Sequence, residues 1–150
     1  MSDNDKVKII VTNRKANFLY EILEKFEAGL VLNGTEVKSL REGKANLQDA
    51  YAKLMKNELY LLNCNISPYK FGNVNNHDPV RARKLLLHKY QIKKIKKSLE
   101  EKGLTLIPLK LYLKDSLVKV ELGIARGKKV FDKRESIKKR EVERSIQRGG

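Results

Sequence analysis

The chain has 150 residues and a formal net charge of +15, from 33 Lys and Arg residues against 18 Asp and Glu residues. This length fits one domain with a short appended segment, and the excess of positive charge is typical of proteins that bind the phosphate backbone of nucleic acids. The single cysteine, Cys64, excludes an intramolecular disulfide and any cluster of cysteine metal ligands. The apolar runs, such as Leu59–Leu62, are too short to span a membrane, and the N-terminus has no signal-peptide pattern, so we expect a cytoplasmic protein.

The first elements that the sequence predicts are a strand and a helix. Val7–Val11 is rich in β-branched residues and predicts a strand. Asn17 is a candidate N-cap, because Phe18, Ile22 and Phe26 recur after it at four-residue spacing. This periodicity predicts a helix that includes these three residues.

Glycines and a polar turn mark the next part of the chain. From Ala28 to Arg41, apolar residues are spread among Gly29 and Gly34, which predicts strands with a kink or bulge at the glycines. Asp49–Leu62 predicts a β-hairpin, with Lys56–Glu58 as its turn.

A long loop and an amphipathic helix follow. The loop, Ser67–Arg83, is rich in Pro, Gly, Asn and Asp, and loops of more than about 12 residues in compact domains are usually functional or disordered. Gln91–Lys102 predicts an amphipathic helix, and Gly103 is the expected residue after its C-terminus. The apolar stripe of this helix consists of Ile92, Ile95 and Leu99.

Two strands with clear alternation come next. Apolar and polar residues alternate over Leu109–Leu113 and again over Val118–Ile124, and Asp115–Ser116 supplies the turn between them. Short strands with two helices in so small a chain favour a closed barrel, because closure removes edge strands. We therefore expect a mainly β fold with flanking helices, built on an OB-like β-barrel.

The composition changes after Ala125, so we divide the chain into a barrel domain, residues 1–125, and a basic C-terminal tail, residues 126–150. The tail contains ten basic and four acidic residues. A capping-box pattern begins at Asp132, but the few large apolar residues after it form no continuous face. We expect the tail to be disordered when free and helical when bound to a polyanion.

The sequence shows no catalytic or metal-binding pattern. His77 and His88 stand near no cysteine and in no metal-ligand spacing, and there is no nucleophile elbow or glycine-rich phosphate loop. We therefore expect a protein that is not an enzyme and requires no cofactor. His77 is either a solvated turn residue or a functional one, and Cys64 is expected to be a small buried apolar residue.

Several longer strings are more specific than any of these patterns. In chain order they are Phe26–Gly29, Gly34–Arg41, Asn76–Pro79, Arg83–Lys89, Ala125–Lys129 and Asp132–Arg134. Together they closely resemble the SmpB family, the tmRNA-binding or SsrA-binding proteins. The resemblance extends over about residues 7 to 141.

This resemblance implies an OB-type barrel that binds the tRNA-like domain of tmRNA. It further implies that the complex is delivered with elongation factor Tu to stalled ribosomes. There the protein occupies the small-subunit decoding centre, and its tail enters the empty mRNA channel. The stalled chain is then transferred and tagged for proteolysis, which is the reaction sequence called trans-translation.

The resemblance also implies which residues contact RNA. Barrel contacts with tmRNA map onto Glu27, Leu86 and His88, with Asn13 and Arg14 beside them. Phosphates repel a carboxylate, so Glu27 fits an RNA contact only if it accepts hydrogen bonds from bases or riboses; otherwise it is a helix-end carboxylate or a surface ion pair. His88 can either stack or hydrogen-bond. The implied tail contacts with the ribosome or with RNA are Lys128, Lys129, Phe131, Asp132, Lys133, Arg134, Ile137, Lys138, Lys139 and Arg140.

Three other classes of function share some of these features. A structural RNA-binding module, such as a ribosomal protein, has a similar size and charge, but the strings Gly34–Arg41 and Arg83–Lys89 argue against it. An enzyme acting on RNA is disfavoured because no acid, base and nucleophile occur together. A membrane-surface tail is disfavoured because the tail has few apolar residues.

Overall fold

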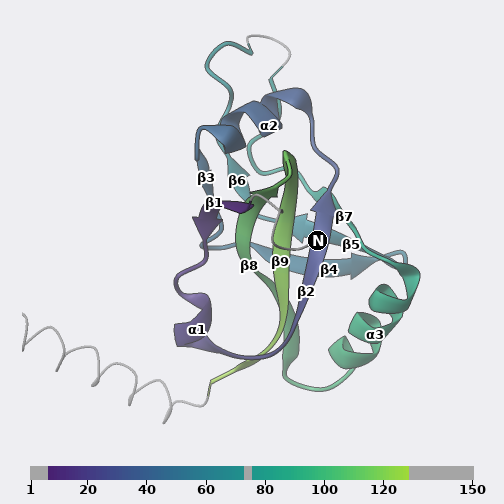
Figure 1. Cartoon of the computed structure of the whole chain (residues 1–150). Coiled ribbons are helices and arrows are strands. Elements are labelled where there is room, and N and C mark those ends of the chain that lie inside the picture. The colour runs from purple at the N-terminus through teal and green to yellow at the C-terminus, as the bar shows by residue number, and fades with distance from the viewer. Residues whose placement is uncertain (1–6, 73–75, 129–150) are drawn as a thin grey trace, which may run out of the picture.

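Strands predominate in the part of the chain that the structure describes, residues 7–72 and 76–128 of a computed structural model (Figure 1). The strands are β1 (Val7–Thr12), β2 (Tyr20–Leu30), β3 (Ala45–Asn46), β4 (Tyr51–Met55), β5 (Glu58–Leu62), β6 (Asn65–Ile66), β7 (Arg83–Leu86), β8 (Leu104–Lys114) and β9 (Leu117–Gly127). The helices are α1 (Ala16–Leu19), α2 (Gly34–Arg41) and α3 (Lys89–Leu99).

The main sheet closes on itself. Its strand order is β1-β8-β4-β5-β7-β2-β9, and β9 also pairs with β8, so all of these strands except β1 form a ring of antiparallel pairs. The long strand β8 pairs with β4 at Leu106 and with β1 near its end, at Lys110–Lys114. The prediction of a mainly β fold with an OB-like barrel and flanking helices is confirmed.

Apolar side chains from every side of the ring fill the barrel interior. Leu59 on β5, Leu111 on β8 and Leu122 on β9 are fully buried and belong to one continuous core. Ile95 of α3 joins the same core, so the predicted apolar stripe of this helix does face inward. The helix itself begins and ends slightly earlier than predicted, at Lys89 and Leu99.

Both predicted hairpin turns are present. Lys56 and Asn57 connect β4 to β5 with φ of 51° and 64°, and Asp115 and Ser116 connect β8 to β9 with φ of 49° and 72°. Two consecutive residues with positive φ are characteristic of a type I′ turn, whose twist matches that of the paired strands. Asn and Asp tolerate this conformation better than most residues, which is why the turns were readable from the sequence.

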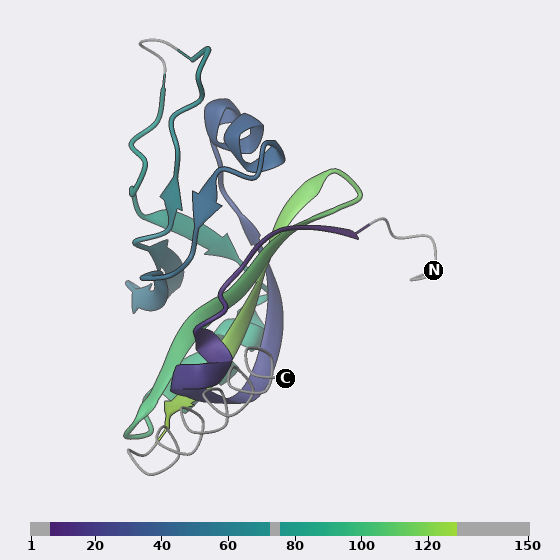
Figure 2. The ribbon, with the colours of Figure 1, turned by 90° about the vertical axis from the view of Figure 1, so that its left-hand side faces the viewer.

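A β-bulge divides β8 between two faces. The register of β8 with β9 shifts between Pro108 and Lys110. Leu111 consequently faces the barrel interior, whereas Leu109 packs in a second, smaller core with Ala16 of α1 and Ala125 of β9. Figure 2 shows β8 and β9 as one long twisted ribbon with α1 beside it.

The prediction of a helix through Phe18, Ile22 and Phe26 is wrong beyond its first turn. Helix α1 ends at Leu19, and Tyr20–Leu30 is strand β2. A spacing of four residues fits the period of a strand as well as that of a helix, so the pattern did not separate the two. Pairing with β9 along almost the whole of β2 decides for the strand.

The prediction of strands between Gly34 and Arg41 is also wrong, because this segment is helix α2. The main-chain N–H of Asn33 donates a 2.8 Å hydrogen bond to Oε1 of Glu36, which caps the first turn. An Asn followed three residues later by Glu is a helix-start signal that the strand interpretation overlooked.

The segment between β6 and β7 contains no helix or strand in its described residues, as the loop prediction required. Strand β9 continues to Gly127, two residues beyond the predicted end of the barrel domain. The predicted behaviour of the tail concerns residues that lie, from Lys129 onward, outside the described part of the chain.

Candidate nucleic-acid interface

Glu27, Leu86 and His88, which are far apart in the sequence, meet at one hollow of about 500 Å³. Glu27 lies on β2, Leu86 ends β7, and His88 immediately precedes α3. Strands β2 and β7 approach closely here, since a Cβ at Gly29 would lie 3.4 Å from Cβ of Leu86, an ordinary van der Waals contact. The structure therefore brings together three of the five barrel residues that the sequence singled out.

The carboxylate of Glu27 is held from one side. Tyr112 on β8 donates its hydroxyl hydrogen to Oε2 of Glu27, and Nζ of Lys114 lies 3.5 Å from Oε1. The hydrogen bond from Tyr112 lowers the pKa of Glu27 below its ordinary value of 4.5; partial burial opposes this change, and the charge of Lys114 adds to it. Glu27 is thus an oriented, ionised acceptor on an exposed strand face, and it does take part in a surface ion pair.

Two aromatic rings also line this hollow. The rings of His88 and Tyr90 are stacked, with centroids 5.5 Å apart and planes 11° from parallel. The main-chain N–H of His88 donates a hydrogen bond to Oε1 of Gln91, which fixes the start of α3. Tyr90 is 69% exposed and Leu86 is 50% exposed, so an apolar and aromatic surface faces solvent beside the carboxylate. Such a surface can stack an unpaired base.

Sequence reasoning missed Tyr90 and Lys119, which line the same hollow. Lys119 lies on β9, opposite Gly29 in the strand register. The alternation of β9 already indicated that Lys119 points out of the barrel, but nothing in the sequence placed it near His88. Tyr90 had a readable signal, because an aromatic residue on the polar face of an amphipathic helix is unusual.

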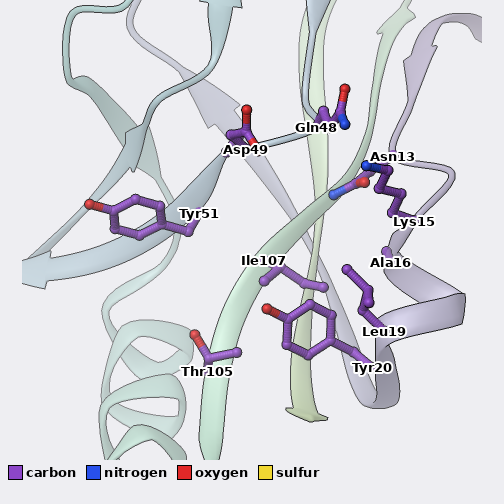
Figure 3. Close-up of a pocket in the computed structure, with 11 residues that line it drawn as sticks. Asn13, Lys15, Ala16, Leu19, Tyr20, Gln48, Asp49, Tyr51, Thr105 and Ile107 are labelled. Atoms are coloured by element: carbon purple, nitrogen blue, oxygen red, sulfur yellow. The ribbon is translucent and has the colours of Figure 1, made fainter. Parts of the chain in front are cut away.

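Asn13 and Arg14 lie outside this hollow. Nδ2 of Asn13 donates a 3.0 Å hydrogen bond to the carbonyl of Pro108, and its main-chain N–H bonds to the carbonyl of Leu109, so Asn13 joins the end of β1 to β8. Arg14 lines a smaller hollow with Asn13, and Asn13 also borders a hollow of about 420 Å³ between α1 and β8. Figure 3 shows this larger hollow, with Ile107 and Thr105 of β8 on one side and Gln48 and Asp49 on another. The structure does not bring Asn13 and Arg14 next to Glu27.

Three of the sequence strings that carry the family resemblance meet inside the protein. Glu36 from Gly34–Arg41 is fully buried and ion-paired with Arg83 from Arg83–Lys89. His77 from the third string, Asn76–Pro79, is also buried. These strings therefore mark the packing of α2 against the long loop and β7.

His77 is neither solvated nor part of the hollow. Its Nδ1 lies 2.8 Å from the hydroxyl of Thr35, and its Nε2 lies 2.8 Å from the carbonyl of Ile66. Both ring nitrogens are thus engaged in joining the loop to α2 and β6. Cys64 is buried as predicted, and burial raises the pKa of its thiol to about 11.

Of the predicted tail contacts, the structure describes Lys128. Its main-chain N–H bonds to the carbonyl of Leu19, so the chain leaves the barrel beside α1. The remaining predicted tail residues lie outside the described residues, and they are Lys129, Phe131, Asp132, Lys133, Arg134, Ile137, Lys138, Lys139 and Arg140. Within residues 7–72 and 76–128, no helix has the length and apolarity to span a membrane, and no three His, Cys, Asp or Glu residues are grouped as metal ligands.

Known proteins match this chain over nearly its whole length. The family model described as SmpB protein matches residues 10–149. The SsrA-binding protein of Gloeothece citriformis is 56% identical over 148 residues, which cover 98% of this chain and 96% of that protein. The SsrA-binding protein of Gloeobacter violaceus is 60% identical over 141 residues, which cover 94% of this chain and 93% of that protein.

A solved structure shares the fold. It is described as "tmRNA-SmpB: a journey to the center of the bacterial ribosome", and the matching chain is 49% identical with a TM-score of 0.70. The match covers 85% of this chain and 93% of that chain.

Proposed function

The chain belongs to the SmpB family, and from this premise we propose that it binds tmRNA, also called SsrA RNA, and brings it to stalled ribosomes for trans-translation. The observation that carries the proposal is the convergence of Glu27, Leu86 and His88 on one exposed hollow, in a chain whose near full-length relatives are named SsrA-binding protein. The net charge of +15 supplies the general attraction that any RNA ligand requires.

The hollow combines the contacts that a folded RNA element needs. The stacked rings of His88 and Tyr90 offer a face to an unpaired base, and Leu86 offers an apolar contact beside them. Lys119 on the same hollow is placed to attract a phosphate. RNA with a tRNA-like shape exposes unpaired bases in its loops, which this kind of surface recognises.

In this proposal Glu27 limits the orientations in which an RNA can bind. Because it is ionised at neutral pH and held by Tyr112, it repels a phosphate and accepts hydrogen bonds from a base or a ribose. An RNA that docks with its backbone against Glu27 is therefore disfavoured, and one that presents donor groups is favoured. Positive charge attracts RNA in many orientations, and the single oriented acceptor reduces that number.

The tail and the partners on the ribosome complete the proposal. The hollow lies beside α3, and the chain leaves the barrel beside α1, on the opposite side of the barrel in Figure 1. This arrangement supports a protein that holds tmRNA on one side while the residues after Lys128 reach the decoding centre and the empty mRNA channel. We further propose delivery with elongation factor Tu, a cytoplasmic location, and action by binding without catalysis.

A paired binding and tagging experiment tests the proposal. The chain is titrated with the tRNA-like domain of tmRNA and with an elongator tRNA of similar length, and it is then added to a translation extract that lacks its own SmpB. We expect clear preference for the tRNA-like domain and restored tagging of chains stalled on a truncated message. Equal affinity for both RNAs, or no tagging, would contradict the proposal.

A further inference from the structure

Three lysines form a stripe along one face of α3. Lys89, Lys93 and Lys96 are spaced so that they lie above one another on the helix, and together with Asn57 and Ile92 they line a hollow of about 420 Å³. We call these three residues the lysine stripe. Seven residues of helix correspond to about 10 Å, so the stripe extends well beyond a single phosphate.

The β4–β5 turn closes the far end of this hollow. Nζ of Lys96 donates a 3.3 Å hydrogen bond to Oδ1 of Asn57, whose positive φ of 64° belongs to the type I′ turn. Lys56 precedes it in the same turn. The turn that meets the end of the stripe therefore carries a lysine of its own.

The charges of the stripe are not neutralised within the described part of the chain. Helix α3 contains no acidic residue. Among the described residues, the lysine of α3 that forms an ion pair is Lys94, whose Nζ lies 2.5 Å from Oε1 of Glu24 on another face of the helix. Lys89 also lies in the first helical turn, where the helix dipole disfavours a cation, and it faces Lys93 one turn later. Charges that oppose two local preferences are expected at functional sites, where a ligand can compensate for their repulsion.

We propose that the lysine stripe binds the phosphate backbone of the RNA whose unpaired base occupies the hollow of Glu27 and His88, an inference that rests on the proposed function. Lys89 of the stripe and Tyr90 of that hollow are neighbours in the first turn of α3. An RNA strand that stacks on His88 and Tyr90 is thereby led along α3 toward the β4–β5 turn. The hollow reads the base, and the stripe fixes the direction of the strand.

The surroundings of the stripe favour RNA over a lipid surface. The large apolar residues exposed in the described part of the chain do not include any that line this hollow, and Ile92, which does line it, is part-buried against the core. A membrane-binding helix would expose an apolar face between its lysines. Here the lysines border a concave surface that a phosphate chain can enter.

Two double variants of the same helix test the proposal. Lys93→Ala/Lys96→Ala removes two charges of the stripe, and Lys94→Ala/Lys97→Ala removes two charges that do not line the hollow. Affinity for the tRNA-like domain of tmRNA is measured at several salt concentrations. If both stripe lysines contact phosphates, the negative slope of log K against log salt becomes shallower by about 1.4 to 1.8 in the stripe variant. The control variant is expected to change the slope by less than half as much.

Equal changes of slope in the two double variants, or no change in either, would overturn the proposal. Unfolding is measured for both, and the stripe variant is expected to be at least as stable as the control because it relieves repulsion. A thiol-directed photo-cross-linker on Lys93→Cys should reach RNA, and Cys64 does not compete for the reagent because it is buried. Failure of the proposed function would instead appear in the unmodified chain, as equal affinity for the tRNA-like domain and a control tRNA.

Discussion

Glu36 on α2 and Arg83 on β7 form an ion pair in which both side chains are fully buried. The rest of the Arg83 guanidinium donates to main-chain carbonyls, among them that of Cys64 at 2.7 Å and that of Pro79 at 3.1 Å. Arg81 donates a second, partly exposed pair of hydrogen bonds to the same carboxylate. The two charges therefore tie the helix, the long loop and the barrel together.

Replacing Arg83 by Met should destabilise the protein severely. The substitution leaves the Glu36 carboxylate buried with only Arg81 as a cationic partner, and loss of one member of a buried pair costs about 3–5 kcal/mol. Urea denaturation monitored by circular dichroism gives the free energy of unfolding. The control is Lys84→Met. Lys84 follows Arg83 on β7 and forms an exposed ion pair with Glu58 of β5, so its loss should lower the free energy of unfolding by less than about 1 kcal/mol.

Stability should fall in acid chiefly through Glu36. Burial acts to raise the pKa of this carboxyl group, but the hydrogen bonds from Arg81, Asn33 and Arg83 outweigh it and hold the pKa below 4.5. The unfolded chain therefore binds the proton of Glu36 more readily than the folded chain does. The stability that the ionised Glu36 contributes is present above about pH 4.5 and is lost as the pH falls through the lower pKa of the folded state. Between pH 6 and pH 3 the unfolding free energy of Glu36→Gln should decline less than that of the unmodified chain. Parallel decline in both proteins would show that other groups govern acid unfolding.

Glu27→Ala should weaken tmRNA binding even though it removes a negative charge. The variant loses an oriented acceptor, and binding titrations at fixed salt should show a severalfold loss of affinity. Glu121→Ala is the matched control, because Glu121 lies opposite Glu27 on β9 and pairs with Lys25 and Lys110 instead. Stronger binding in both variants would mean that Glu27 is only a surface charge.

Tyr90→Ala should reduce affinity for the tRNA-like domain by about 1–3 kcal/mol, the usual contribution of one stacked base. Tyr90→Phe keeps the ring and should retain most of the affinity, whereas loss of binding in both variants would assign the effect to the hydroxyl. Because Tyr90 is 69% exposed, neither substitution should alter stability. Fluorescence anisotropy with labelled RNA and a thermal melt of each variant provide the two measurements.

Removing residues 132–150 should separate the two roles of the protein. Binding to the tRNA-like domain should remain nearly intact, because the hollow and the lysine stripe lie on the barrel and α3. Tagging on stalled ribosomes should be abolished, since the segment that would reach the mRNA channel is lost. Tagging should also fall as the message extends further past the decoding site. Equal loss of binding and tagging would mean that the tail merely adds RNA affinity, and undiminished tagging would mean that it has no part in the mechanism.

The sequence by itself determined the elements whose signals are local. Alternation and turn residues identify the β4–β5 and β8–β9 hairpins, because Asn57 and Asp115 adopt the positive φ that a tight turn requires. The stripe of Ile92 and Ile95 identifies α3 in the same way. The charge and the ordered strings were also sufficient to indicate RNA and the SmpB family.

Only the tertiary structure decided which residues meet. Tyr20–Leu30 became a strand because β9 pairs along it, and a four-residue spacing fits both periods. Glu36 is buried because Arg83, 47 positions later, neutralises it. Glu27, Leu86 and His88 share a hollow, whereas Asn13 is committed to β8. Such contacts depend on how the ring of strands closes, and periodicity within one segment carries no information about a partner strand elsewhere in the chain.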